Sequence, residues 1–331
     1  MKFPEHAYLA TVVTALGGTL LAMPFWRWLC IRTGHVDDPG HRKIHDRPIA
    51  LAGGLGVLTG FLMPVLGGLV VLALRWLPPD VIDNLLYGFG QRKWQLLAIF
   101  GGAIGMVALG WLDDRHELKP ATKFAGQLLI AVAVAASGVR ITLFVPSVVF
   151  SFTITIFWLL TLINALNFMD NMNGLCAGVG AIAAGWFAAI AMLHGQYLVA
   201  LLALAIGGAL VGFLPFNFPK ASSFLGDAGS HLVGFLLAVL AILPHFYSAA
   251  LPNRAAVISP LLILGVPLLD LAWVVVIRWQ LGKPFWIGDN NHLSHRLHRR
   301  GCSRAQTVII LWVLGLMLGA GALVMNLAPW R

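Results

Sequence analysis

Ten long apolar segments decide what this chain can fold into. Apolar runs of about 17 to 25 residues are long enough to cross the hydrocarbon core of a bilayer as helices. The runs cover about residues 7–29, 51–77, 93–112, 121–139, 147–163, 175–193, 197–213, 231–250, 256–278 and 305–328. Only 11% of the residues are charged, against about 25% in a soluble domain. We therefore expect an all-α polytopic membrane protein, a bundle of about ten transmembrane helices, with residues 1–331 forming a single domain.

The distribution of Lys and Arg between the loops predicts the orientation of the chain. Cytoplasmic loops carry an excess of these residues. If the N-terminus lies outside, the inside loops hold 15 of the 22 Lys and Arg residues, so both termini are predicted to lie outside. The net charge of +9 then reflects cytoplasmic loops and anionic partners. Nucleic acid is not an expected partner, because no compact basic run with interleaved aromatic residues occurs.

The polar stretches gather in the predicted inside loops, whereas the outside loops are short. These stretches are residues 32–47, 113–117, 164–173, 217–230 and 283–304. This asymmetry predicts an active-site cleft on the cytoplasmic face. An anionic-metabolite transporter would instead place polar groups near the middle of the membrane and show internal repeats. The sequence contains no repeat of that kind.

The stretch NALNFMDNMNGL, residues 164–175, places four asparagines and an aspartate between two apolar runs. Its polar groups at Asn164, Asn167, Asp170 and Asn173 are three residues apart, which puts them on one side of a helical turn. A plain polar loop does not require such spacing. We therefore expect a converging set of oxygen and amide groups at the membrane surface.

Asp113 and Asp114 end the third apolar run, and Lys123 and Gln127 open the fourth one turn apart. A carboxylate pair can hold a divalent cation or transfer protons; the alternative is a solvated helix end. Negative charge is unfavourable at a helix C-terminus, which favours a functional role. Lys123 is a candidate phosphate ligand, with a lysine that reaches to the membrane interface as the alternative.

The segment FLPFNFPKASSFLGDAGS, residues 213–230, has Asn217 and Asp227 as its polar anchors. Gly226 and Gly229 allow a sharp turn and expose N–H groups at the start of the next helix. That arrangement suits a diphosphate with a metal ion beside it.

Two basic segments complete the candidate site. Lys43 and His45 lie in the sequence RKIH, which either binds a lipid head group or is ordinary cytoplasmic charge. His292, His295 and Arg296 lie in a His-rich loop that suits an anion better than zinc, because Arg offers a planar fork to phosphate.

The ninth apolar run contains two prolines and an internal charge. Pro260 and Pro267 predict a kink. Asp270 is either a functional carboxylate or the partner of Arg278 on the same helix face.

Together these motifs resemble the polyprenyl-phosphate N-acetylhexosamine-1-phosphate transferase family, over nearly the whole chain. Phospho-N-acetylmuramoyl-pentapeptide transferase is a relative of that family. The resemblance implies a bundle of ten or eleven helices in the bacterial cytoplasmic (inner) membrane, surrounded by membrane lipids. It also implies transfer of a sugar phosphate from a UDP-N-acetylhexosamine to undecaprenyl phosphate with release of UMP, as the first membrane step of cell-envelope polysaccharide synthesis, including O-antigen and teichoic acid. Mg²⁺ is the implied cofactor, with Mn²⁺ as an alternative, and a homodimer is compatible with the resemblance.

The resemblance also assigns roles to individual residues. It makes Asp113 and Asp114 the acidic pair at the reaction centre, and Asp227 the first metal ligand with Asn173 as a second. The expected substrate-binding residues are Lys43, His45, Lys123, Asn167, Asp170, Asn173, Asn217, His292, His295 and Arg296. An in-line displacement at the β-phosphorus is the expected mechanism, with a covalent route through Asp113 or Asp114 as the alternative.

Two departures from the family pattern bear on the substrate. Ser294 stands at the middle histidine of the usual His-x-His-His-Arg sequence, and Asn173 stands where many members have Asp. The muramoyl-pentapeptide enzymes carry three consecutive histidines, which this chain lacks. Both histidine differences argue against the muramoyl-pentapeptide reaction, which remains the alternative. The resemblance implies UDP-N-acetylglucosamine as the donor, because it is the commonest donor in this family.

Overall fold

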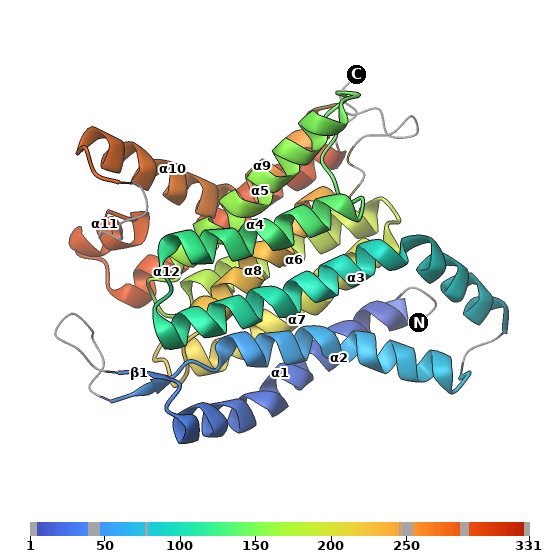
Figure 1. The fold of residues 1–331 in the computed structure, drawn as a ribbon, viewed down its shortest axis with the longest axis horizontal. Helices are drawn as coiled ribbons and strands as arrows, with labels where there is room; N and C mark the ends of the chain where they lie inside the picture. The colour runs from blue at the N-terminus through green and yellow to red at the C-terminus, as the bar shows by residue number, and fades with distance from the viewer. Residues whose placement is uncertain are drawn as a thin grey trace.

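The computed structural model describes residues 5–38, 47–76, 79–244, 246, 254–284 and 291–327. Within this part the chain is almost entirely helical, as Figure 1 shows. The helices are α1 (Glu5–Thr33), α2 (Gly53–Ala73), α3 (Pro79–His116), α4 (Pro120–Ala136), α5 (Val148–Met169), α6 (Leu175–Leu193), α7 (Tyr197–Asn217), α8 (Gly226–Ile242), the 3-10 helix η1 (Arg254–Ile258), α9 (Ser259–Ile263), α10 (Gly265–Gln280), α11 (Leu293–Arg299) and α12 (Arg304–Leu327). The strands β1 (Val36–Asp37) and β2 (Ile49–Ala50) pair antiparallel.

Seven of the described helices are long and apolar enough to cross a membrane: α1, α2, α3 from Phe89 onward, α5, α6, α7 and α12. The bent pair of η1–α9 and α10 makes an eighth if it is one broken span. The apolar helices α4 and α8 are shorter, at 17 residues each. The prediction of an all-α polytopic membrane protein is thus confirmed. The count of ten spans and the outside location of the termini stay predictions.

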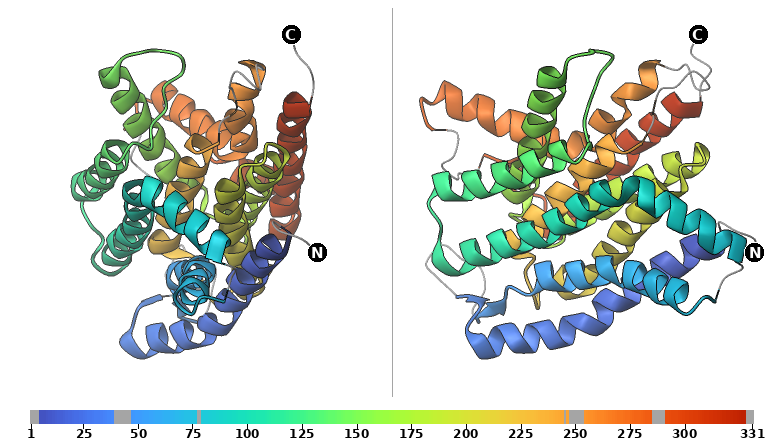
Figure 2. Two further views of the ribbon diagram at one scale, coloured as in Figure 1. Left: turned by 90° about the vertical axis from the view of Figure 1, so that its right-hand side faces the viewer. Right: turned by 45° about the vertical axis from the view of Figure 1, so that its right-hand side comes forward.

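The expected kink in the ninth apolar run is present between α9 and α10. The two helices meet at 72° around Leu264. Pro260 lies in the first turn of α9, and Pro267 lies in the first turn of α10, where its missing N–H weakens continuation of the helix across the break. As a result α10 leaves the bundle and projects to one side (Figure 2).

Helix α8 forms the centre of the bundle, since every residue from Ala228 to Ala241 is buried. Glycines let its neighbours approach it closely. A Cβ on Gly110 of α3 would lie 2.3 Å from the backbone N of Ala228, and one on Gly54 of α2 would lie 2.6 Å from the backbone N of Gly229. These backbone contacts fix the N-terminal turn of α8 between α2 and α3.

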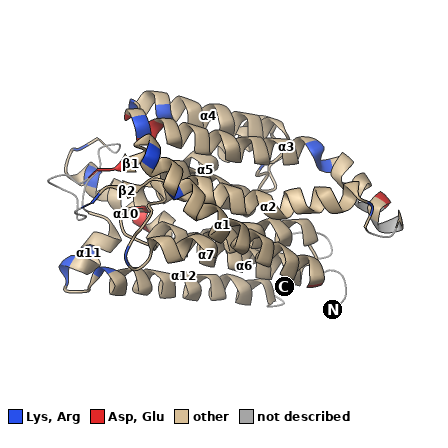
Figure 3. Ribbon diagram, turned by 90° about the horizontal axis from the view of Figure 1, so that it is seen from below, with Lys and Arg blue, Asp and Glu red and all other residues tan. Residues whose placement is uncertain are grey.

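Charged residues gather at the end of the bundle that carries β1, β2 and α11, as Figure 3 shows. The two strands are tied to this end by the segment that precedes α8. Ala50 forms a parallel bridge with Ser223, and its carbonyl accepts hydrogen bonds from Phe224 N at 2.9 Å and Ser223 Oγ at 3.0 Å. The loop before α2 and the turn before α8 are therefore held together at one end of the molecule.

Candidate active site

Lys123, in the first turn of α4, lies between two carboxylates. Its Nζ is 2.7 Å from Asp113 Oδ2 and 2.9 Å from Asp227 Oδ2. Asp113 comes from the end of α3 and Asp227 from the first turn of α8, so three helices meet at one ammonium group. The Lys123 and Asp113 side chains are only 19% and 8% exposed. Shielding from water strengthens the attraction between such charges. It also means that the shielded carboxylates need a cation beside them, because a buried charge without a partner is strongly destabilising.

Asn167, near the end of α5, joins the same cluster. Its Nδ2 donates to Asp227 Oδ1 at 2.6 Å and to Ser230 Oγ at 2.9 Å, and its Oδ1 accepts from Lys123 Nζ at 3.3 Å. Asp227 is therefore held by an amide on one oxygen and an ammonium group on the other. The structure thus brings together four of the candidate site residues: Asn167, Lys123, Asp113 and Asp227.

A second row of polar side chains lies one helical turn deeper on α4, α5 and α8. Asn164 of α5 donates through Nδ2 to Gln127 Oε1 of α4 at 2.9 Å. Gln127 Nε2 lies 3.3 Å from Nε2 of His231 on α8. The site thus has two layers, with Lys123, Asn167 and Asp227 above and Gln127, Asn164 and His231 below. Two side chains of the lower layer are shielded from solvent, since Gln127 is 1% and His231 0% exposed.

Asp114 differs from its neighbour Asp113 in what it contacts. Its Oδ1 accepts from Asp227 N at 2.8 Å and its Oδ2 from Ala228 N at 3.2 Å. Consecutive residues of an α-helix point about 100° apart, so the two carboxylates face different partners. Asp114 caps the N-terminus of α8, which satisfies backbone N–H groups that a helix start leaves open.

This contact corrects one expectation about the α8 N-terminus. The N–H groups of Asp227 and Ala228 bond to Asp114 and are not open to a diphosphate. Gly226, with φ +71°, makes the turn into α8, as expected. A direct role of Asp114 in the reaction stays a prediction.

We expect Asp114→Asn to destabilise the protein. The asparagine amide would place an N–H against one of the two backbone donors, which leaves a donor unpaired at a loss of about 1–3 kcal/mol. Thermal unfolding of the detergent-purified protein would measure this loss. Glu117→Gln is the control, because Glu117 is exposed just beyond α3. An Asp114→Asn protein as stable as the control would contradict a capping role.

Asp170 follows α5 as its C-cap and is half-buried. Burial, and then the charges of Asp227 and Asp114, raise the pKa of its carboxyl from 3.8 to about 8. The charge of Asp227 contributes to this shift, and the substrate-binding role of Asp170 stays a prediction. Clustered carboxyl groups of this kind favour a divalent cation nearby.

Asn217 and Asn173 make contacts within the protein. Asn217 is buried, accepts from Gly174 N at 2.6 Å and donates to Ser223 O at 3.0 Å. Asn173 donates to Pro219 O at 3.2 Å. Both side chains therefore brace the turn before α8 against the loop between α5 and α6. The substrate-binding role predicted for both, and metal ligation by Asn173, stay predictions.

Asp270 of α10 holds the start of the His-rich loop. Its Oδ2 lies 2.7 Å from His292 Nδ1, and its Oδ1 accepts from Leu293 N at 2.7 Å. The guanidinium of Arg278, the alternative partner of Asp270, lies over the Phe168 ring at 5.4 Å. Asp270 thus orients His292.

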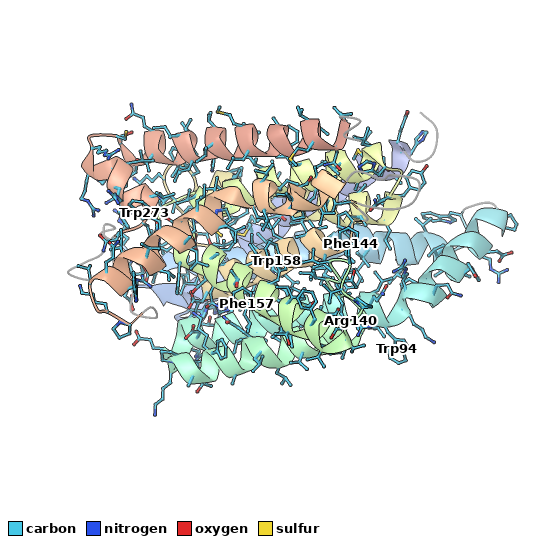
Figure 4. All side chains as sticks on the ribbon, turned by 90° about the horizontal axis from the view of Figure 1, so that it is seen from above. Trp94, Arg140, Phe144, Phe157, Trp158 and Trp273 are labelled. Carbon is cyan, nitrogen blue, oxygen red and sulfur yellow. The ribbon has the colours of Figure 1, made fainter. Side chains whose placement is uncertain are left out.

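Ser294 and Arg296 attach α11 to its surroundings. Ser294 Oγ donates to Asn171 Oδ1 at 2.7 Å, so the residue that departs from the family pattern contacts the loop after α5. The Arg296 guanidinium lies 4.4 Å from the ring centre of Trp273, which Figure 4 places on α10 at the α11 end. Burial, and then the nearby His292 and Arg299, lower the pKa of His295. Binding of a diphosphate by this loop stays a prediction.

Some of the site could not be placed or was not anticipated. Lys43 and His45 lie outside the described residues. His231 is not among the predicted site residues, because it is the first residue of the apolar run 231–250. Its spacing of four from Asp227, which puts both on one helix face, is the signal that identifies it.

Asp113, Asp227 and His231 together form a candidate metal centre. Each offers one ligand atom, and these atoms lie within 4.8 Å of one another. The two carboxylates are the oxygen ligands that Mg²⁺ prefers.

Comparison of the sequence with known proteins shows the family of this chain. The glycosyl transferase family 4 pattern matches residues 96–245, which include α4, α5 and the start of α8. A decaprenyl-phosphate N-acetylglucosaminephosphotransferase of Mycobacterium tuberculosis is 33% identical over 329 residues, covering 89% of this chain and 77% of that protein. The chain belongs to the polyprenyl-phosphate N-acetylhexosamine-1-phosphate transferase family.

Two further relatives match this chain over most of its length. A probable undecaprenyl-phosphate N-acetylglucosaminyl 1-phosphate transferase of Bacillus subtilis is 28% identical over 330 residues, covering 97% of this chain and 85% of that protein. A phospho-N-acetylmuramoyl-pentapeptide-transferase of Shouchella clausii is 30% identical over 277 residues, covering 77% and 80%. The resemblance of the motifs to this transferase family is thus confirmed.

Proposed function

We propose that this protein transfers N-acetylglucosamine-1-phosphate from UDP-N-acetylglucosamine to undecaprenyl phosphate and releases UMP. The names of the Bacillus and Mycobacterium relatives support a polyprenyl-phosphate acceptor and this sugar. The observation that carries the proposal is the cluster of Asp113, Asp227 and Lys123 at the charged end of an apolar bundle. Such a site can hold charged phosphates beside a membrane.

The donor set fits Mg²⁺, with Mn²⁺ as an alternative. Asp113 and Asp227 would hold the ion, because their carboxylates lie close together and already share one cation, the Lys123 ammonium group. When bound, the ion would offset the negative charge of the diphosphate and of the departing UMP.

The chain's own residues then serve binding and orientation. An oxygen of the acceptor phosphate forms a bond to the β-phosphorus, and the bond from that phosphorus to the bridging oxygen breaks, so UMP leaves with the electron pair. A phosphate monoester is largely a dianion at neutral pH, with a second pKa of about 6, so a strong general base is not required. Lys123 contributes positive charge at the phosphates, and Asn167 keeps Asp227 oriented.

The proposal includes a location. We place the site on the cytoplasmic face of the bacterial inner membrane, because most Lys and Arg residues lie in the loops at that predicted face. The lipid tail of the acceptor would stay in hydrocarbon beside α10, which projects from the bundle and exposes Trp273.

The decisive experiment is UMP release by the purified protein with undecaprenyl phosphate, Mg²⁺ and a panel of UDP-sugars. We expect release with UDP-N-acetylglucosamine and much less with UDP-N-acetylmuramoyl-pentapeptide. Release with the pentapeptide alone would replace the proposed donor with the alternative. No release with any sugar, from protein that shows a cooperative thermal transition, would refute the transferase proposal.

A further inference from the structure

His231 is a buried side chain that the proposed reaction does not use. It lies one helical turn after Asp227 on α8 and is 0% exposed. An imidazole nitrogen lies within 4.8 Å of a carboxylate oxygen of both Asp113 and Asp227. Among the described residues, Nδ1 of His231 has no hydrogen-bond partner. A buried polar group without a partner calls for an explanation.

The hydrogen bonds of the lower layer determine the tautomer of His231. Asn164 Nδ2 donates to the carbonyl of Leu160 at 2.8 Å, so the other atom it contacts, Gln127 Oε1, is also an acceptor. The Gln127 amide therefore turns its N–H toward His231 Nε2. Since that nitrogen accepts, a neutral imidazole carries its proton on Nδ1.

This assignment bears on how His231 meets a cation. A histidine ligates a metal through a nitrogen lone pair, while its other nitrogen donates to a partner. Here the Nε2 lone pair faces the Gln127 amide, and Nδ1 carries hydrogen. His231 is thus a hydrogen-bond donor in a cluster whose other members are two carboxylates. A single oxygen atom that accepts from Nδ1–H and binds a cation on the carboxylates would give Nδ1 its missing partner.

We propose that His231 is a positioning residue that holds an oxygen ligand of the cation through Nδ1–H, without binding the cation itself. The chemical class of that ligand is a water or phosphate oxygen. The proposal rests on the proposed function only in taking a divalent cation as the cofactor. Oxygen ligands fixed in this way suit Mg²⁺, which retains several waters when it binds to proteins.

Mn²⁺ is the probe, because its electron paramagnetic resonance reports directly bound nitrogen. Pulsed spectra would be recorded on the full-length protein with Mn²⁺ alone and with Mn²⁺ plus UMP. We expect no coupling from a directly bound imidazole nitrogen. We expect His231→Leu to raise the Mn²⁺ dissociation constant by about 10- to 100-fold. His231→Asn should recover most of that affinity, because its amide N–H takes a position near that of Nδ1–H.

His35→Leu is the matched control. His35 is 3% exposed, and it stacks on Trp111 at 3.7 Å between ring centres without belonging to the carboxylate cluster. Mn²⁺ affinity should be unchanged in this variant. Direct nitrogen coupling in the wild-type protein would overturn the proposal in favour of a histidine ligand. Unchanged affinity in a folded His231→Leu protein, or no Mn²⁺ binding with or without UMP, would overturn it as well. UMP release with Mg²⁺ tests the transferase function separately.

Discussion

Asp227→Asn is expected to reduce UMP release by at least about 10²- to 10³-fold, the loss typical when a preorganised electrostatic group is removed. Asp227 Oδ2 pairs with Lys123 Nζ, and Asp227 Oδ1 accepts a hydrogen bond from Asn167 Nδ2. An asparagine has the same shape but no charge, and its amide N–H must face one of these two donors. The variant therefore loses a cation ligand and the partner of Lys123 together. Initial rates with undecaprenyl phosphate and UDP-N-acetylglucosamine would measure the effect.

Asp83→Asn is the control for this variant. Asp83 is exposed near the start of α3, far along the chain from the carboxylate cluster, and the substitution changes the net charge by the same amount. Its UMP release should match the wild type. An Asp227→Asn protein with more than about a tenth of the wild-type rate would remove Asp227 from the reaction centre, since a tenfold loss is only about 1.4 kcal/mol of barrier.

Gly110→Ala is expected to lower both stability and activity. The added Cβ would lie 2.3 Å from Ala228 N and 2.4 Å from Asp227 C, which are backbone atoms that cannot rotate away. Helix α3 or α8 must therefore shift, at a loss of about 1–3 kcal/mol for overpacking. The same shift moves Asp227 relative to Asp113, so UMP release should fall further than stability alone predicts. Thermal unfolding and initial rates on the same preparation would show both effects.

Gly101→Ala separates this contact from the general effect of replacing a helical glycine. Gly101 lies on the same helix and is exposed, and nothing lies within 4 Å of its added Cβ. Alanine favours a helix over glycine by about 1 kcal/mol, so this variant should be as stable as the wild type or slightly more stable. Equal effects of the two substitutions would show that the approach of α3 to α8 does not matter.

The membrane class and the one-ended distribution of polar residues could be predicted because they depend on local composition. Apolar runs and the three-residue step from Asn164 to Asp170 are visible in any short window of sequence. The same reasoning places Asn167 and Asp227 at one membrane face, but their contact depends on how α5 packs against α8. The kink near Pro267 also follows from a local rule about proline.

The different contacts of Asp113 and Asp114 could not be predicted, because they depend on where α8 lies. A pair of adjacent carboxylates carries no local sign of which one meets Lys123 and which one caps another helix. The start of α8 differs from the prediction for the same reason. The predicted loop 217–230 includes residues 226–230, which instead form the first turn of α8, and Asp114 of α3 caps that turn. The apolar residues that follow His231 conceal its role in the sequence, although ionisable residues in membrane helices are functional candidates.

The short length of α8 bears on where Asp227 would lie relative to a bilayer. Its 17 residues extend about 25 Å, whereas the hydrocarbon core is about 30 Å thick. Protein surrounds this helix almost completely, so it need not match the bilayer as a lipid-facing helix must. If its C-terminal end reaches the far interface, Asp227 lies about 5 Å below the near one. The reacting phosphate of a polyprenyl lipid can then meet Asp227 without any part of its chain being drawn out of the hydrocarbon.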